Sequence, residues 1–246
     1  MRTKSIFMAT TALALFASAT QAQADGMYIS VLGGLNWQPG SSGSQFTTDG
    51  TTSTFTEYNE DADTGFVLGG AIGTSLSNWA EGLRAEVEVS YRRNDRDGEW
   101  FTSADLGRFD GSATGNLSGN VSNFAIMANV WYDVNMGWKA VPYVGGGAGW
   151  ARSHMDLLAV PTSVHDFAAC QGPGPCASTD QERNGFAYQL GAGFNYPVAN
   201  GVNVGLGYRY FNGPNFDPLF IGKNSLPVPI DNDNHSVAAN LSIAIN

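Results

Sequence analysis

The fold is decided by residues 83–92, which read LRAEVEVSYR. Apolar or aromatic side chains occupy the odd positions of this stretch, whereas the even positions hold charged residues and one serine. A helix brings residues three or four positions apart onto one face, but a period of two belongs to a β-strand whose faces meet different surroundings. The stretch therefore predicts a strand with one apolar and one polar face.

The same alternation recurs in other parts of the chain. Residues 185–196 and 236–245 show it most clearly, with bulky apolar residues at every second position. Together with residues 83–92, these segments predict eight strands. The further segments are Met27 to Trp37, Gly65 to Leu76, Val121 to Val134, Ala140 to Ser153, Gly185 to Tyr196, Val202 to Tyr210 and Ser236 to Ile245.

The connections between these segments alternate between short and long. Residues 77–82, 135–139 and 199–201 read as tight turns, whereas residues 38–64, 93–120, 154–183 and 212–234 are long. In an up-and-down sheet this alternation places all long connections at one end, and an even strand count places both termini at the other. Transmembrane β-barrels with short periplasmic turns and long external loops have this arrangement.

Alternation alone leaves open whether the apolar face points into a soluble, lipocalin-like barrel or out into lipid. A face in contact with water is usually rich in Lys and Glu, yet beyond the N-terminal segment the chain has only Lys139 and Lys223, both outside the predicted strands. The second face holds mainly Gly, Ala, Ser and Asn, which suits the crowded interior of a small barrel. The sequence therefore predicts an all-β fold, namely an eight-stranded antiparallel up-and-down transmembrane β-barrel with short periplasmic turns and long external loops.

With the apolar face toward lipid, the polar residues of the strands point into the barrel. Charged side chains on the inward face must pair with one another or with trapped water, because an unpaired buried charge costs several kcal/mol (order of magnitude). We expect a structural role for them rather than a proton or ion pathway. These predicted interior residues are Arg84, Glu86, Glu88, Arg92, Asp133 and Arg209.

Aromatic residues fall toward the two ends of the predicted strands, as expected for interfacial girdles. At the long-loop end these are Trp37, Tyr91, Trp150, Tyr188 and Tyr208, and at the short-turn end Trp79, Tyr132, Trp138 and Tyr196. Trp131 has inward parity and is expected to be a core residue.

The N-terminal segment has the features of a secretory signal peptide. Arg2 and Lys4 precede an apolar stretch from Ile6 to Ala19, and Ala22-Gln23-Ala24 is a small-x-small cleavage site. We therefore assign residues 1–24 to a signal peptide and residues 25–246 to one outer-membrane barrel domain. The 12 Lys and Arg against 22 Asp and Glu give a net charge of −10, which argues against nucleic acid as a partner.

Three motifs resemble a known family of barrels. They are Asn129-Val130-Trp131-Tyr132-Asp133, the run PYVGGGAGW at 142–150, and GLGYRYF at 205–211. The resemblance is to small outer-membrane barrels of the opacity-protein and alphaproteobacterial 25/31 kDa surface-antigen type, related in shape to the OmpA transmembrane domain. It implies insertion by the barrel assembly machinery and surface loops with antigenic, adhesive or structural roles. Such proteins usually end on an aromatic residue, whereas this chain ends in Asn246.

The long loops contain no recognisable catalytic, cofactor-binding or metal-binding motif. Cys170 and Cys176 lie together in the third long loop, and export to an oxidising compartment favours a disulfide between them. The loops are acidic, but their spacing resembles no calcium-binding loop, so a solvated acidic face is the expected interpretation. The three histidines show no motif of a nucleophile and its base, and we expect no catalysis, cofactor or metal site.

The sequence thus predicts an outer-membrane surface protein with a structural or loop-mediated role of the adhesin or antigen type. A small-solute porin is the alternative, and it gains support if the glycine rows of the strands at 140–153, 185–196 and 202–210 leave a water path. A lipid-modifying enzyme, with Ser and His within hydrogen-bond reach at the rim, is a further alternative. The expected partners are outer-membrane lipid, lipopolysaccharide, the assembly machinery and a host or cell-surface ligand at the loops.

Overall fold

The computed structural model describes residues 26–48, 53–105, 110–165, 177–217, 219–220, 227–228 and 231–245. The predicted signal peptide and the predicted disulfide between Cys170 and Cys176 lie outside these residues. The described residues form strands joined by turns. The strands are β1 (Met27–Trp37), β2 (Ser41–Thr48), β3 (Ser53–Ala62), β4 (Gly65–Ser75), β5 (Leu83–Asp105), β6 (Asp110–Asp133), β7 (Val141–His165), β8 (Ala177–Ala199), β9 (Val202–Asn212), β10 (Leu219–Phe220), β11 (Pro227–Val228) and β12 (Asp233–Ala244).

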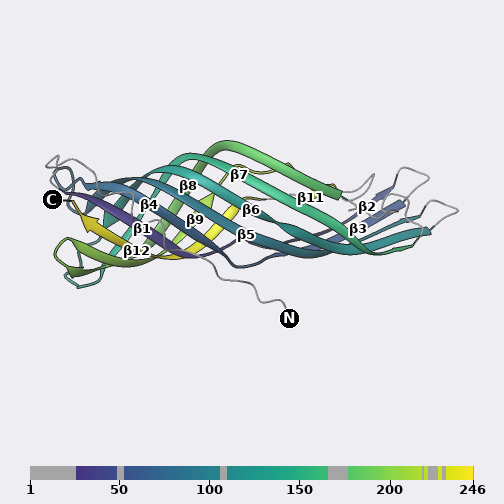
Figure 1. Cartoon of the computed structure of the whole chain (residues 1–246), viewed down its shortest axis with the longest axis horizontal. Coiled ribbons are helices and arrows are strands. Elements are labelled where there is room, and N and C mark those ends of the chain that lie inside the picture. Colours follow the sequence, from purple (N-terminus) through teal and green to yellow (C-terminus); the bar gives the residue numbers. More distant parts are fainter. Residues whose placement is uncertain are drawn as a thin grey trace.

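Eight of these strands close into a ring. Their antiparallel order is β5-β4-β1-β12-β9-β8-β7-β6, and β6 pairs back onto β5 from Leu83↔Tyr132 onward. Each strand of the ring therefore has a partner on both sides, so no backbone edge faces the surroundings at this level. The predicted eight-stranded antiparallel barrel is confirmed (Figure 1).

The outer face of the ring is apolar, as the alternation predicted. On β5 the side chains of Val87 and Val89 are 52% and 43% exposed, while Glu88 between them is fully buried. Exposed aromatic residues border this apolar band at both ends. They include Tyr91, Phe124, Trp150, Phe186, Tyr188 and Tyr208 on one side and Trp79, Tyr132, Trp138 and Tyr196 on the other. The outer face is therefore matched to lipid, with two aromatic borders.

The connections at the short-turn end are tight, as expected. Gly82 and Gly201 adopt φ values of 82° and 71° there, in the left-handed region that favours glycine. The C-terminal end of the described chain lies at this end of the molecule, and the long strands run away from it (Figure 1).

At the opposite end the structure differs from the expectation of long loops. β5, β6, β7 and β8 do not stop at the lipid boundary, because residues 93–105, 110–120, 154–165 and 177–184 continue the same ladders. The predicted first loop holds the hairpin β2–β3, whose second strand pairs with β5 from Ser53↔Asp105 to Ala62↔Arg96. We call this sheet, of order β2-β3-β5-β6-β7-β8, the extension.

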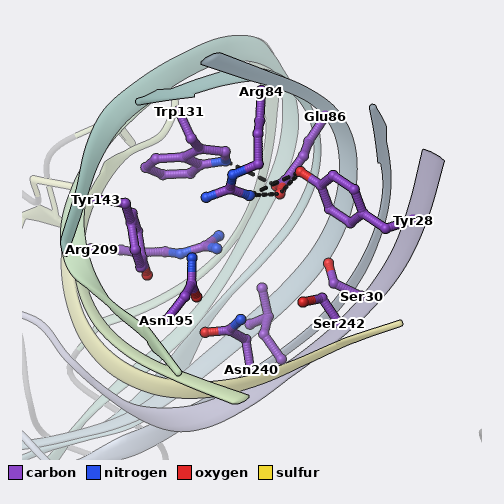
Figure 2. Close-up of a pocket in the computed structure, with 11 residues that line it drawn as sticks. Tyr28, Ser30, Arg84, Glu86, Trp131, Tyr143, Asn195, Arg209, Asn240 and Ser242 are labelled. Atoms are coloured by element: carbon purple, nitrogen blue, oxygen red, sulfur yellow. Dashed lines mark hydrogen bonds and ion pairs between the residues drawn. The ribbon is translucent and has the colours of Figure 1, made fainter. Parts of the chain in front are cut away.

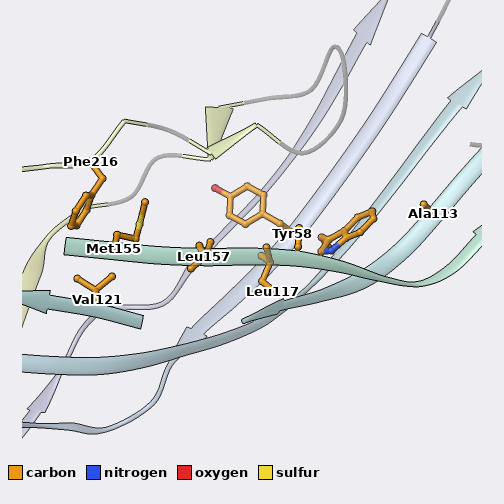
Figure 3. Packing of buried hydrophobic residues seen from close by; sticks show 9 residues of the cluster. Tyr58, Ala113, Leu117, Val121, Met155, Leu157 and Phe216 are labelled. Atoms are coloured by element: carbon orange, nitrogen blue, oxygen red, sulfur yellow. The ribbon is translucent and has the colours of Figure 1, made fainter. Parts of the chain in front are cut away.

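The hydrophobic pattern reverses its phase where the ring passes into the extension. On β7, Val144 and Trp150 face outward in the ring, whereas Met155 and Leu157 are buried on the inward face beyond it. Met155 and Leu157 belong to an apolar cluster on the inner side of the extension (Figure 3). It comprises Tyr58, Trp100, Ala113, Leu117, Val121, Met155, Leu157, Ala159 and Phe216. The outer face of the extension carries many polar and acidic residues, together with exposed Phe46, Leu158 and Val160. The extension therefore resembles a sheet in water, with its main apolar cluster on the inner side.

Within the described residues the sheet of the extension does not close, because two strands of the ring end early. β9 ends at Asn212 and β12 begins at Asp233, so neither continues beside β8 or β2. Part of the chain between them packs on the extension: Phe216 joins the apolar cluster, and Asp217 contacts β8. Among the described residues, β2 pairs along one side only, with β3.

The position of the lipid band predicts how the outer face responds to charge. Val87→Arg places a guanidinium near the middle of the band and is expected to lower the free energy of unfolding by roughly 2–4 kcal/mol. Asn116→Arg, on the outer face of the extension, is expected to change it by less than about 0.5 kcal/mol. Urea titration of the protein in lipid vesicles measures both, and equal effects of the two substitutions contradict the assigned boundary.

Candidate functional site

Polar side chains project into the barrel at the short-turn end and line a small pocket there. The guanidinium of Arg84 donates to both carboxylate oxygens of Asp133, at 2.7 and 2.9 Å, and to Glu86 at 3.0 Å. Glu86 also accepts hydrogen bonds from the Tyr28 hydroxyl at 2.6 Å and the Trp131 indole N–H at 2.9 Å. Figure 2 shows Tyr28, Arg84, Glu86 and Trp131 projecting toward the middle of the ring from different strands. They tie β1, β5 and β6 together across the interior.

A second ion pair lies deeper in the ring. Arg209 of β9 donates to Glu88 of β5, and Asn129 donates to the same carboxylate at 3.2 Å. Glu88 is fully buried, and Arg209 lies over the ring of Trp131 at 5.2 Å. This pair spans the barrel, because β5 and β9 are not neighbours in the ring.

Arg92 is a buried cation without a carboxylate at ion-pair distance among the described residues. It donates to Ser90 at 2.9 Å and Gln189 at 3.3 Å, and its guanidinium lies 4.1 Å from the centre of the Phe211 ring. Its neutral partners and the aromatic face compensate part of the cost of burial.

Asparagines form the next layer toward the extension. Asn36 donates to Asn94 and, at 2.9 Å, to Asn234. Asn232 exchanges hydrogen bonds with Asn123, at 2.8 and 3.0 Å. These residues come from different strands and from the end of the long connection before β12, so the layer fixes where that connection enters the barrel.

The last polar contact before the apolar cluster is a buried ion pair. Arg96 of β5 donates to Glu60 of β3 at 2.7 Å, and both side chains are almost completely buried. Gln38 accepts from Arg96 at 3.1 Å. The interior thus changes from ionic to amide to ionic to apolar along the barrel axis.

Large side chains occupy the space beside several glycines of the predicted rows. A Cβ on Gly145 or Gly191 meets the ring of Trp131 at 2.8 or 3.2 Å, and one on Gly193 meets the Tyr143 hydroxyl at 2.7 Å. The glycines are therefore the space into which large residues of neighbouring strands fit. The space beside these three glycines, which a porin would need, is therefore occupied in the described barrel.

The six residues predicted for the interior all lie on its inner side. Arg84, Glu86 and Asp133 form one group and Glu88 and Arg209 a second, whereas Arg92 contacts Ser90, Gln189 and the Phe211 ring. The sequence interpretation missed the asparagine layer and the pair of Arg96 with Glu60. These residues occupy inward-facing alternate positions when the strands are continued beyond their predicted ends. That alternation is the signal by which they could have been predicted.

The outer face of the extension carries most of the exposed charge. Arg152 donates to Glu182, and this contact holds the pKa of the Glu182 carboxyl below its usual range. Asp156 and Asp180 lie directly opposite each other on β7 and β8, and His154 is 3.6 Å from Asp180.

Other kinds of site find no support among the described residues. No group of three or more His, Cys, Asp or Glu side chains is arranged to hold a metal ion in the described part of the chain. Of the histidines, His235 shares a 2.6 Å hydrogen bond with the Tyr208 hydroxyl, and His154 pairs with Asp180. In the same residues no α-helix is long and apolar enough to span a bilayer.

A closed eight-stranded ring with an apolar outer band and a filled polar interior defines an outer-membrane β-barrel. Residues 7–242 match the family model of the outer membrane protein beta-barrel domain. The chain belongs to this family, and its location is the outer membrane.

Solved structures of small outer-membrane barrels are similar to the chain. Neisserial surface protein A shares 17% identity with a TM-score of 0.49, covering 91% of this chain and 100% of that one. OprG of Pseudomonas aeruginosa shares 15%, covering 89% and 97%, with a TM-score of 0.45. The attachment invasion locus protein Ail of Yersinia pestis shares 12%, covering 89% and 99%, with a TM-score of 0.37. No curated protein sequence matches the chain.

Removing one partner of the deep ion pair is expected to destabilise the barrel. Arg209→Met leaves the carboxylate of Glu88 buried without its cation, at an expected cost of roughly 3–5 kcal/mol in free energy of unfolding. Arg93→Met removes an exposed partner of Asp95 and is expected to cost about 0–1 kcal/mol. Urea titration monitored by the mobility of unboiled samples in gels checks both values. Similar losses for both variants would contradict the buried ion pair between Glu88 and Arg209.

The filled interior predicts a barrel that does not conduct ions steadily. In planar bilayers we expect no stable open level for the unchanged protein, whereas combining Trp131→Ala with Tyr143→Ala removes the rings above the glycines and creates one. Val130→Ala with Val144→Ala, on the outer face, is the matched control and is expected to stay silent. Steady conductance of the unchanged protein contradicts this assignment.

Proposed function

We propose that the protein is a non-catalytic surface protein of the outer membrane, whose extension is an interaction surface of the adhesin or antigen type. The observation that supports this proposal most directly is the length of β5 to β8. Beyond Tyr91, β5 continues to Asp105, which is about 45 Å of further strand. A barrel that served only as a membrane anchor has no need of a packed sheet beyond the lipid.

The construction of the extension supports a role in water. Its inner side buries an apolar cluster, and its outer side exposes polar and acidic residues. Outer-membrane barrels place short turns in the periplasm and long connections outside the cell. By this rule the extension lies outside the cell, where it presents a hydrogen-bonded sheet.

The alternatives receive less support. A porin needs a path where the rings of Trp131 and Tyr143 cover the glycines. A lipid-modifying enzyme needs a serine at hydrogen-bond distance from a rim histidine, but the contacts of His235 and His154 are to Tyr208 and Asp180.

The finer parts of the proposal follow from this role. We place the chain with the opacity-protein and 25/31 kDa surface-antigen type of barrel, exported with a cleaved signal peptide and inserted by the barrel assembly machinery. Outer-membrane lipid and lipopolysaccharide surround the aromatic borders, and a host or cell-surface ligand is the partner of the extension.

Labelling of single cysteines on intact cells tests the display. In a background with Cys170→Ser and Cys176→Ser, Asn116→Cys on the extension is expected to react with a membrane-impermeant maleimide. Asn78→Cys, in an exposed short turn, is the control and is expected to react only after the outer membrane is opened. Labelling of Asn78→Cys but not of Asn116→Cys on intact cells overturns the proposed orientation.

A further inference from the structure

The outer face of three neighbouring strands changes from aromatic to polar at the border of the apolar band. The last lipid-facing aromatic residues on β5, β6 and β7 are Tyr91, Phe124 and Trp150. The next outward-facing positions on these strands hold Arg93, Ser122 and Arg152. Two arginines and a serine therefore lie side by side immediately beyond the hydrocarbon of the membrane.

The two arginines hold an exceptional position among the cations of the protein. No other Lys or Arg in the described residues faces outward on a strand of the ring. The remaining ones lie inside the barrel, contact the connection after β9 or belong to a short turn, and they are Arg84, Arg92, Arg96, Arg209, Arg183 and Lys139. In the described part of the chain, the positive charge on the outer face of the ring is thus confined to one place.

The register of the sheet brings both arginines beside Ser122. Arg93 lies directly opposite Ser122 in the pairing of β5 with β6. Arg152 lies opposite Phe124 in the pairing of β6 with β7, which makes it a diagonal neighbour of Ser122. Such neighbours have Cβ atoms about 5 Å apart when directly opposite and about 7–8 Å apart on the diagonal, so both guanidinium groups reach a ligand above the serine. Ser122 leaves room for this ligand and offers a hydroxyl donor.

Neither arginine is held by a buried carboxylate. The Arg93 Nε atom lies 3.7 Å from Asp95, and Arg152 donates to Glu182. The two arginine side chains are 46% and 57% exposed, and exposed ion pairs of this kind are weak. Asp95 lies farther from the apolar band than Arg93, and Glu182 lies opposite His154, which is farther from the band than Arg152. The side of both arginines that faces the membrane is therefore free of these carboxylates.

We propose that Arg93, Ser122 and Arg152 bind a phosphate group of lipid A, the phosphorylated glycolipid part of lipopolysaccharide. This inference deepens the proposed function and rests on the orientation given there, which places this border in the outer leaflet. Arginine forms paired hydrogen bonds with phosphate oxygens. Because the adjacent hydrocarbon has a low dielectric constant, these contacts are stronger here than in open water.

The surface below the site suits the acyl chains of such a lipid. Ile126 and Val130 on β6 are 43% and 50% exposed. Beside them, Ala128 lies opposite Ala148, and Val130 lies opposite Gly146, so small side chains face the lipid on β7. A lipid therefore contacts the arginines and the apolar surface at once, whereas a free phosphate meets only the charge. This difference favours the lipid as the ligand.

Binding of fluorescent lipid A that carries both phosphates tests the inference on the purified, folded protein in maltoside micelles. We expect saturable binding, weakened roughly tenfold or more by combining Arg93→Gln with Arg152→Gln. Lys139→Gln with Arg183→Gln removes the same charge elsewhere and is the matched control, expected to change binding less than about twofold. The mobility of unboiled samples in gels verifies that every variant is folded.

Two changes of ligand separate the sources of phosphate. Lipid A without its phosphates keeps the acyl chains and is expected to bind roughly tenfold or more weakly. Phosphatidylglycerol carries the smaller charge of a phosphodiester, and inorganic phosphate lacks acyl chains. Both are expected to displace the probe only at concentrations roughly tenfold or more above that of unlabelled lipid A.

A carboxylate at the serine tests the position of the site. Ser122→Glu places a negative charge between the two arginines and is expected to abolish binding, because it pairs with them and repels phosphate. Thr114→Glu adds the same charge to the outer face of β6 but farther along the extension, and it is expected to leave binding unchanged.

Three results overturn the proposal: equal losses for both neutralised pairs, equal affinity for lipid A with and without phosphates, or unchanged binding to the Ser122→Glu variant. Displacement by phosphatidylglycerol or inorganic phosphate as readily as by lipid A overturns the assignment to the glycolipid. Because these assays use purified protein, they do not depend on which side of the barrel faces outward. Their failure is therefore distinguishable from a failure of the cell-labelling test of display.

Discussion

Backbone pairing in lipid is the constraint on which the rest of this structure depends. Lipid offers no partner for a free N–H or carbonyl group, so the sheet must close, and the pairing of β5 with β6 closes it. Eight strands leave an interior just wide enough for side chains. The large residues Trp131 and Tyr143 therefore require glycines opposite them, and the charges require partners that cross the barrel. Closure, glycine content and buried ion pairs are thus consequences of one requirement.

Above the lipid this requirement ends, because water can pair with open edges. In the part of the chain that the structure describes, the ring accordingly opens where β9 and β12 stop, and β3 replaces β4 as the neighbour of β5. The extension then needs an apolar core of its own, which the cluster around Leu117 and Leu157 supplies. The same four long strands serve as a membrane wall along one part of their length and as a sheet in water along the other.

This change of surroundings also explains how much of the structure the sequence predicts. The ring was predictable because Leu83 to Tyr91 and Val202 to Tyr210 keep their apolar residues on one parity. The extension was not predictable. Between Trp150 and Met155 on β7, the apolar residues change from the outward-facing to the inward-facing positions, so the alternation followed from the ring ends there. The interior charges were identified from parity alone, whereas their partners were not, since Glu88 and Arg209 are joined only by barrel closure. The hairpin β2–β3 lacks apolar alternation and resembles a loop.

The reversal of hydrophobic phase also sets the depth of the protein in its membrane. A shift of one residue pair toward the outside exposes more apolar surface of the ring to water. A shift of one pair in the other direction carries Arg93 and Arg152, which follow the last lipid-facing aromatics Tyr91 and Trp150, into hydrocarbon. Both displacements cost free energy, so the barrel has one favoured height, and the extension stands at a constant distance above the bilayer.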